Sequence, residues 1–321
     1  MHSTHAPPHL RHDPLADRTV IVAPQRADRP NELAGATIPC PFCAGHESLT
    51  PPDVLRAPAA LSVPWRARIV PNRFPVASTE TTAVLATAQD EPAARGVHDV
   101  VIESPYHVRS ILDVDPAGWC DAWELCRRRL ADLADRGDLA WGMVFKNSGP
   151  AAGASLEHVH SQLVALDFVP QGFAAEIESA RRSTDPFGDL LRAADREERI
   201  VESLGDLVAV VPPAPRQPFE TWILPRSAEP HFHATDPGRV AALAALTQSI
   251  IGRLERLVPR ADYNWWLHQM PYAAPDALAA AWHWHLEIMP RINGLAGFEL
   301  GTGCHINTVA PRDAARRLRM A

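Results

Sequence analysis

The chain has 321 residues, and its 31 Lys and Arg residues against 38 Asp and Glu residues give a formal net charge of −7 at pH 7. This acidic balance disfavours nucleic acid and anionic membranes as partners. No uncharged run is long enough to span a bilayer and no apolar signal-peptide core follows Met1, so we expect a cytoplasmic protein without a membrane partner.

The first part of the chain alternates short apolar runs with proline-containing bends. Residues 1–12 contain several histidines, and we expect them to form a flexible tail. Residues 116–136 place Trp119, Trp123 and other apolar side chains three to four apart, which predicts a helix. Strands are predicted at residues 19–23, 66–76 (where a bend follows), 98–103 and 140–146, and in the apolar run after His160.

The same pattern recurs after a charged segment, residues 170–206, which is predicted to be a helical connector. Further strands are predicted at residues 207–211, 219–225, 264–267 and 283–287, with a helix at residues 240–257. The sequence therefore predicts an internal duplication, with one half at residues 13–169 and the other at residues 207–321. Consecutive strands with one long helix per half favour an α+β fold, in which helices pack on a mostly antiparallel sheet.

Cys40 and Cys43 form a C-x-x-C pair. Five cysteines are too few for a disulfide framework in a chain of this length. The pair is therefore either two thiolate ligands of a metal ion or two ordinary buried cysteines. In the first case imidazoles must complete the site, and His107 and His158 are the candidates. Four protein ligands would make such a site structural.

Residues 145–166 contain the candidate catalytic centre. A Gly- and Ser-rich bend precedes His158, His160 and Gln162, which share one face of the following strand because they lie two residues apart. The neutral imidazole of His160 can attack phosphorus, and the amide of Gln162 can donate an N–H to a phosphoryl oxygen. The bend, residues 147–155, offers backbone N–H groups to an anion. A buried structural histidine is the alternative, but these neighbours favour a nucleophile.

From residue 11 to residue 319 the chain resembles the galactose-1-phosphate uridylyltransferase and ADP-glucose phosphorylase family of the histidine-triad superfamily. The resemblance rests on the segments CPFC, VPNRFP, FKNSGPAAGASLEHVHSQL, PFETWILP, HWHLEIMPR and GFELGTGCHIN. It implies two tandem histidine-triad-like halves, a homodimer, and ping-pong transfer of a nucleoside monophosphate between sugar 1-phosphates.

The resemblance also implies roles for individual residues. His160 becomes nucleotidylated, Gln162 and Ser155 assist it, and Glu299 holds sugar hydroxyls. The positions that match nucleotide- or phosphate-binding residues are Arg26, Arg29, Asn72, Asn147 and Gly153. A structural Zn²⁺ maps onto Cys40, Cys43, His107 and His158. A second divalent metal, found in some members, maps onto Glu176, His268, His283 and His285; the alternative is that the second H-x-H is a degenerate repeat packed in the core.

The chain departs from the family pattern at three places. Val159 stands where the family usually has proline between the two histidines, which leaves both imidazoles in place. Asn293 or Gly294 stands where some uridylyltransferases have a lysine, which weakens the case for a hexose 1-phosphate acceptor. Residues 184–199 contain no cysteine, which excludes a second C-x-x-C zinc site in the connector.

The leading prediction is a hexose-1-phosphate nucleotidyltransferase that binds a nucleotide sugar and a sugar 1-phosphate and reacts through nucleotidyl-His160. The first alternative is a nucleotide-sugar phosphorylase, which uses the same intermediate but transfers the nucleotide to inorganic phosphate. The second alternative is a zinc-stabilised nucleotide-binding module without turnover, which the presence of both His160 and Gln162 disfavours.

Overall fold

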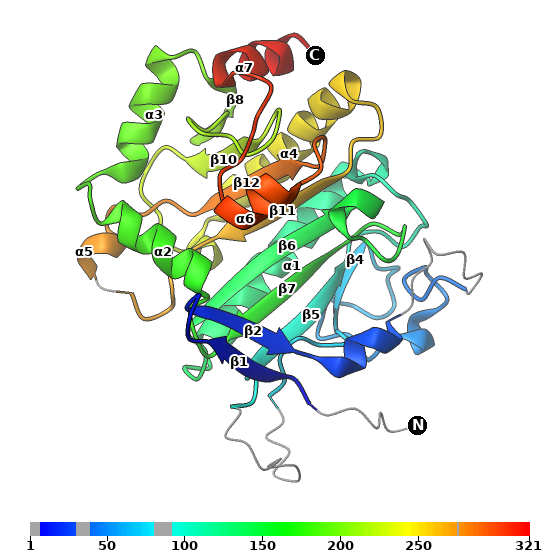
Figure 1. Cartoon of the computed structure of the whole chain (residues 1–321). Coiled ribbons are helices and arrows are strands. Elements are labelled where there is room, and N and C mark those ends of the chain that lie inside the picture. The colour runs from blue at the N-terminus through cyan, green and yellow to red at the C-terminus, as the bar shows by residue number, and fades with distance from the viewer. Residues whose placement is uncertain (1–6, 30–38, 80–91, 275) are drawn as a thin grey trace.

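The computed structural model describes residues 7–29, 39–79, 92–274 and 276–321 (Figure 1). Its centre is a ten-stranded sheet in which all neighbouring strands are antiparallel. In spatial order the strands are β3 (Leu55–Ala57), β4 (Ala67–Pro71), β5 (Gly96–Ile102), β7 (His160–Leu166), β6 (Trp141–Ser148), β11 (Tyr263–His268), β12 (His285–Pro290), β10 (Thr221–Pro225), β9 (Leu207–Val210) and β8 (Ile200–Leu204).

The two halves of the sheet have the same strand order, counted from the outer edge of each half to the centre. One edge gives β3, β4, β5, β7 and β6, and the other gives β8, β9, β10, β12 and β11. In each half the last two strands along the chain are exchanged in space. The pairing of β6 with β11 joins the halves at the centre. The predicted α+β fold with two tandem halves and a mostly antiparallel sheet is confirmed.

Each half contributes one long helix to the same face of the sheet, α1 (Pro116–Ala134) and α4 (Pro237–Leu257). Both helices begin with an aspartate followed by proline, and that aspartate caps the free N–H groups of the first turn. The helices lie behind the sheet in Figure 1 and pack against each other.

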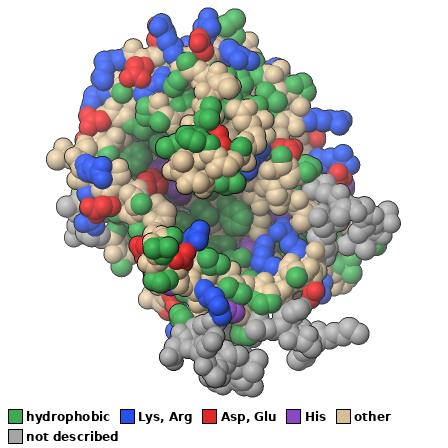
Figure 2. Space-filling model, viewed as in Figure 1, with side chains coloured by type: hydrophobic (Ala, Val, Ile, Leu, Met, Phe, Trp, Pro, Cys, Tyr) green, Lys and Arg blue, Asp and Glu red, His purple; other side chains and the backbone are tan. Residues whose placement is uncertain are grey.

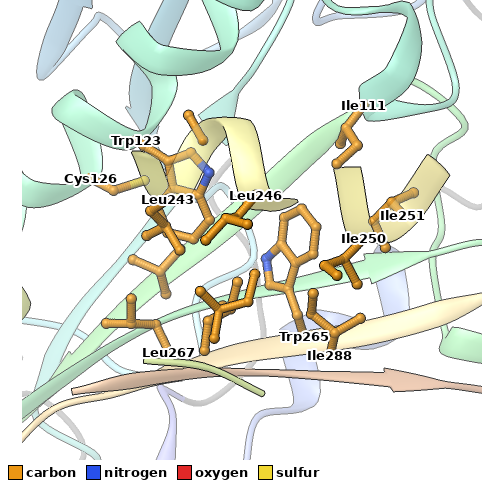
Figure 3. Packing of buried hydrophobic residues seen from close by; sticks show 14 of the residues in the cluster. Ile111, Trp123, Cys126, Leu243, Leu246, Ile250, Ile251, Trp265, Leu267 and Ile288 are labelled. Carbon is orange, nitrogen blue, oxygen red and sulfur yellow. The ribbon is translucent and has the colours of Figure 1, made fainter. Parts of the chain in front are cut away.

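The main core lies between these helices and the sheet. Trp123 from α1 and Leu246 from α4 pack close to Trp265 of β11 (Figure 3). The ring centroids of Trp123 and Trp265 are 6.1 Å apart. The core therefore contains side chains of both halves, which explains why the periodic apolar positions of the two predicted helices are buried.

Smaller elements surround the sheet. They are the hairpin β1 (His9–Asp13) and β2 (Arg18–Val22), the helices α2 (Gln171–Ala180), α3 (Pro186–Arg196), α5 (Asp276–Ala279), α6 (Gly297–Thr302) and α7 (Pro311–Met320), and 3-10 turns at Pro24–Asp28, Glu47–Leu49, Ile111–Asp113, Pro150–Ala152 and Phe232–Ala234. None of the helices in the described ranges is long and apolar enough to cross a membrane.

Two segments have more regular structure than the sequence predicts. Within the predicted tail, residues 9–12 form most of β1, because Leu10 and its partner Ile21 on β2 pack against an apolar cluster beside β7. Within the predicted helical connector, residues 200–204 form β8, which pairs with β9 around Gly205 (φ 59°). In both cases a short hairpin pairs the backbone N–H and C=O groups of a segment. The sequence pattern alone had predicted a tail in the first case and a helix in the second.

Candidate functional site

The glycine-rich loop between β6 and β7 is shaped for close contact with a residue of the second half. Gly149 and Gly153 have φ values of 85° and 79°, which glycine adopts without strain. A Cβ atom on Gly149 would lie 1.8 Å from Oδ1 of Asp262, so there is no room for a side chain. The other carboxylate oxygen of Asp262 accepts the backbone N–H of Ala151 at 2.7 Å.

The pairing of β6 with β11 holds the same loop at a second point. Asn264 lies opposite Asn147 in this pairing. Its side-chain NH2 donates to Oδ1 of Asn147 at 2.8 Å and to the carbonyl of Ala152 at 2.9 Å. The loop that leads to the candidate nucleophile is therefore positioned by both halves.

His160 is the first residue of β7, and its ring is oriented by its own backbone. Its Nδ1 lies 2.7 Å from the carbonyl oxygen of His158, so Nδ1 carries the proton and Nε2 carries the lone pair. Burial, with a smaller contribution from Lys146, lowers the pKa of His160 to about 3. The imidazole is therefore neutral near pH 7, which is the form that can act as a nucleophile.

A cavity of about 450 Å³ lies beside His160. Its walls are largely apolar, with Phe42 and Phe74 among them, and its polar residues include Ser155 and Gln162. The hydroxyl of Ser155 is buried and has no hydrogen-bond partner in the described chain, which is costly unless a ligand supplies one. Burial and the neighbouring charge of Arg26 lower the pKa of Arg29 on the cavity wall. The cavity thus offers apolar contacts to a ring system and donors to an anion.

His160 also lines a second cavity, of about 420 Å³, on the other side of the loop. Asn147 and Gly149 contribute to its wall, together with Arg109 and Arg260. Figure 2 shows a hollow between the α6 segment and the β1–β2 hairpin, with hydrophobic side chains on its floor and Lys and Arg side chains at its edge. His160 therefore borders both cavities.

Two cysteines and two histidines converge beside this loop. Sγ of Cys40 is 3.5 Å from Nδ1 of His158, and Sγ of Cys43 is 3.6 Å from Nδ1 of His107. Tetrahedral zinc bonds of the usual lengths place a sulfur and a nitrogen ligand about 3.6 Å apart. Nε2 of His158 donates to the carbonyl of Ser104 at 2.9 Å, which leaves its Nδ1 lone pair toward the thiols. These four residues can hold a tetrahedral metal ion.

A second group of possible ligands lies in the other half: Glu176, His268, His285 and Glu287. Nδ1 of His268 and Nε2 of His285 lie 2.8 and 3.1 Å from carboxylate oxygens of Glu176. Both nitrogens are buried, and the carboxylate oxygens of Glu176 are within ion-pair distance of them. Burial opposes a charge on His285, but Glu176 and Glu287 outweigh it and raise the pKa of His285 to about 10. The cluster therefore favours positive charge, as a bound divalent cation or a proton.

The two H-x-H segments share one internal contact. Nδ1 of His285 lies 3.1 Å from the carbonyl oxygen of His283, as Nδ1 of His160 lies near that of His158. Both second histidines therefore present Nε2 to their surroundings. The surroundings differ, because an amide (Gln162) follows in the first half and a carboxylate (Glu287) follows in the second.

Known proteins resemble this chain along nearly its whole length. ADP-glucose phosphorylase of Arabidopsis thaliana is 33% identical over 97% of this chain and 92% of its own length. The chain belongs to the galactose-1-phosphate uridylyltransferase and ADP-glucose phosphorylase family. Another family member, galactose-1-phosphate uridylyltransferase of Thermotoga maritima, is 25% identical over 97% of each chain.

One family model and a solved structure agree with this membership. The model of the galactose-1-phosphate uridyl transferase N-terminal domain matches residues 64–170, and a model described as a domain of unknown function, DUF4921, matches residues 130–321. The crystal structure of the A. thaliana ADP-glucose phosphorylase with bound ADP-glucose aligns with a TM-score of 0.80 at 33% identity, covering 98% of this chain and 99% of that one.

In the present chain, the three predicted catalytic residues and two of the predicted nucleotide-binding residues line the same cavity. Arg29, Asn72, Ser155, His160 and Gln162 line the first cavity. Asn147 lines the second cavity, and Arg26 donates to the carbonyl of Phe74 at 2.6 Å beside the first.

Two predicted site residues lie apart from these cavities. Gly153 ends the 3-10 turn of the loop and lines neither cavity. Glu299 lies on α6, where its carboxylate accepts the backbone N–H of Ala296, and it does not line either cavity in the described chain. The sugar-binding role of Glu299 stays a prediction.

The predicted second metal set needs one correction, at His283. Nδ1 of His283 donates to the carbonyl of Pro225 at 2.7 Å, and the ring stacks on Phe187. Glu287 takes its place in the cluster with His285. The reason is that β12 begins at His285, so the next side chain on the same face of the strand is residue 287.

Sequence reasoning missed a buried ion pair beside the backbone of His160. Nζ of Lys146 donates to Glu103 at 2.5 Å and to the carbonyl of His160 at 2.8 Å, and Ser161 donates to the same carboxylate. Lys146 and Glu103 are each 2% exposed. Removing one partner of such a pair typically costs about 3–5 kcal/mol. The available signal was a charged residue at the end of each of two largely apolar predicted strands, Glu103 in one and Lys146 in the other.

The corrected cluster predicts different effects for two neighbouring substitutions. Glu287→Gln should lower the metal content of the purified protein by elemental analysis after dialysis, because it removes a negative ligand. His283→Asn should leave the metal content unchanged, because His283 lies outside the cluster. Equal loss in both variants, or loss only in His283→Asn, would contradict the correction.

Proposed function

We propose that this protein is a nucleotide-sugar phosphorylase of the ADP-glucose phosphorylase type, which converts ADP-glucose and inorganic phosphate to ADP and glucose 1-phosphate. The observation that carries this proposal is the lone pair of His160 Nε2 beside a cavity that has an unpartnered Ser155 hydroxyl and the amide of Gln162. The 33% identity to a named ADP-glucose phosphorylase along nearly the full chain supports the choice of substrate.

The reaction has two steps. In the first, Nε2 of His160 attacks the α-phosphorus, the N–P bond forms, and the P–O bond to the β-phosphate breaks, which releases glucose 1-phosphate. In the second, an oxygen of inorganic phosphate attacks the same phosphorus, the N–P bond breaks, and ADP leaves. The Nδ1 proton stays on its bond to the carbonyl of His158 throughout.

The surrounding residues would stabilise the charge that develops on phosphorus-bound oxygens. Gln162 and Ser155 line the cavity with His160 and each offer a donor. Arg26 and Arg29 would attract the diphosphate electrostatically. The apolar wall with Phe42 and Phe74 would contact the adenine ring.

The uridylyltransferase reaction, with a hexose 1-phosphate acceptor, is the second candidate function. Its support is the 25% identity to a named galactose-1-phosphate uridylyltransferase. The phosphorylase is favoured because the more similar relative has that name and because Asn293 or Gly294 stands where some uridylyltransferases have lysine.

Intact-mass spectrometry after mixing with separate nucleotide sugars tests the proposal. ADP-glucose should add the mass of AMP, and phosphate should then remove it and release ADP. His160→Gly should abolish the adduct, whereas His12→Gly, at an exposed position on β1, should retain it. A UMP adduct that only hexose 1-phosphate removes would favour the second candidate. No adduct, or one that persists in His160→Gly, would overturn the mechanism.

We further propose that Cys40, Cys43, His107 and His158 hold a structural Zn²⁺. The sulfur–nitrogen distances and the donor set support this assignment. Bound zinc would fix His158, whose carbonyl orients the His160 ring.

Zinc content and thermal stability should fall together in the Cys40→Ser variant, because the metal bonds would stabilise the fold. Cys120→Ser, on α1 and outside the cluster, is the matched control. Unchanged zinc content in Cys40→Ser would refute the site.

We also propose that the protein is a homodimer. Phe298 and Leu300 on α6 and Ile306 after it are exposed, with relative exposures of 55%, 73% and 56%. Glu299 lies on the same helix and lines neither of the two cavities beside His160. A second copy that covers this segment would bury the apolar side chains. A monomer mass in sedimentation equilibrium would contradict this proposal.

A further inference from the structure

His98 is a buried polar residue on β5 that contacts the candidate catalytic amide. Its side chain is 4% exposed, and the β5–β7 register places Val100, two residues along the strand, opposite Gln162. Nε2 of His98 lies 3.0 Å from Oε1 of Gln162. The environment of His98 determines which of these two groups donates.

The position of the proton on the His98 ring follows from a contact with a backbone N–H, which can only donate a hydrogen bond. The N–H of Val76 donates to Nδ1 at 3.0 Å, so Nδ1 carries a lone pair. A neutral imidazole must then carry its proton on Nε2. Burial, aided by Arg26 and Arg29, lowers the pKa of His98 to about 4, which is consistent with a neutral ring near pH 7.

A second backbone donor removes the other possible acceptor. The N–H of Phe74 donates to Oδ1 of Asn72 at 2.8 Å, so the NH2 group of Asn72 is the end that lies 3.1 Å from Nε2 of His98. That NH2 group cannot accept the imidazole proton. Oε1 of Gln162 is therefore the acceptor. If the amide of Gln162 were reversed, three N–H groups would meet without an acceptor.

We propose that His98 is a positioning residue that holds the amide of Gln162 with its oxygen inward and its NH2 group toward the phosphoryl group on His160. The proposal rests on the proposed function, in which Gln162 donates to a phosphoryl oxygen. Without the His98 contact, the amide can rotate and present its oxygen to the anionic phosphoryl group, which would repel it.

Two substitutions separate this role from simple support of the loop. His98→Gln can place an NH2 group near the position of Nε2, so it can restore the donor to Gln162. His98→Asn can place an oxygen near the position of Nδ1, so it can keep the contact with Val76 but lacks the donor. If His98 only supports the loop, Asn should be the better replacement. If His98 orients Gln162, Gln should be better.

The measurement is the single-turnover rate of AMP transfer to His160, followed by intact mass, with the Kd for ADP-glucose measured separately. His98→Asn should slow transfer about 10- to 100-fold, with little change in Kd. This is at or below the 10²–10³-fold typical of losing an oxyanion donor outright, because Gln162 is still present but no longer oriented. His98→Gln should recover most of the rate. In a Gln162→Ala background, His98→Asn should have little further effect, because the group it orients is absent.

Other outcomes overturn the proposal. They are an unchanged rate in His98→Asn, the same slowing in the Gln162→Ala background, and a faster His98→Asn than His98→Gln. A wild-type protein that forms no nucleotidyl adduct would overturn the proposed function instead. Nitrogen NMR of histidine-labelled protein tests the proton position without turnover. The His98 ring should carry its proton on Nε2 near pH 7, and a proton on Nδ1 would overturn the inference in either case.

Discussion

The pairing of β6 with β11 is the contact on which the site depends. It joins two duplicated halves into one sheet, and it places Asn264 of the second half against the loop that leads to His160. A loop with two left-handed glycines has little intrinsic preference for one shape. Its shape is therefore set by partners from the other half, so the candidate site lies in one half but is built by both.

The duplicated scaffold orients a histidine in the same way twice and gives it two chemical environments. In both halves a backbone carbonyl two residues earlier holds Nδ1. Beside His160, burial and the nearby charge of Lys146 favour a neutral ring. Beside His285 the neighbours are carboxylates, which favour a charged ring or a bound cation. The different roles proposed for the two histidines thus rest on their adjacent side chains.

Much of the fold and part of the site could be predicted from sequence because the signals are local. Alternating and helical apolar spacing predicted the strands and the two long helices, and the convergence of Cys40, Cys43, His107 and His158 matches the candidate ligand set. The roles of these residues remain predictions.

The features that sequence did not reveal depend on strand ends and on pairing between distant strands. Residues 283, 285 and 287 are each two apart and would share one face of a strand. Spacing alone could therefore not show which two of them lie near His268. The role inferred for His98 requires the register of β5 against β7 and two loop N–H groups. No local pattern contains this information.

The lack of space at Gly149 has a consequence for how relatives can be recombined. Because a side chain there would collide with Asp262, the residue types at these two positions constrain each other across the boundary between the halves. A chimaera that takes one half from this chain and the other from a relative inherits this steric match only if both parents share it. The two halves can therefore diverge in sequence elsewhere, but the residues at positions 149 and 262 must change together.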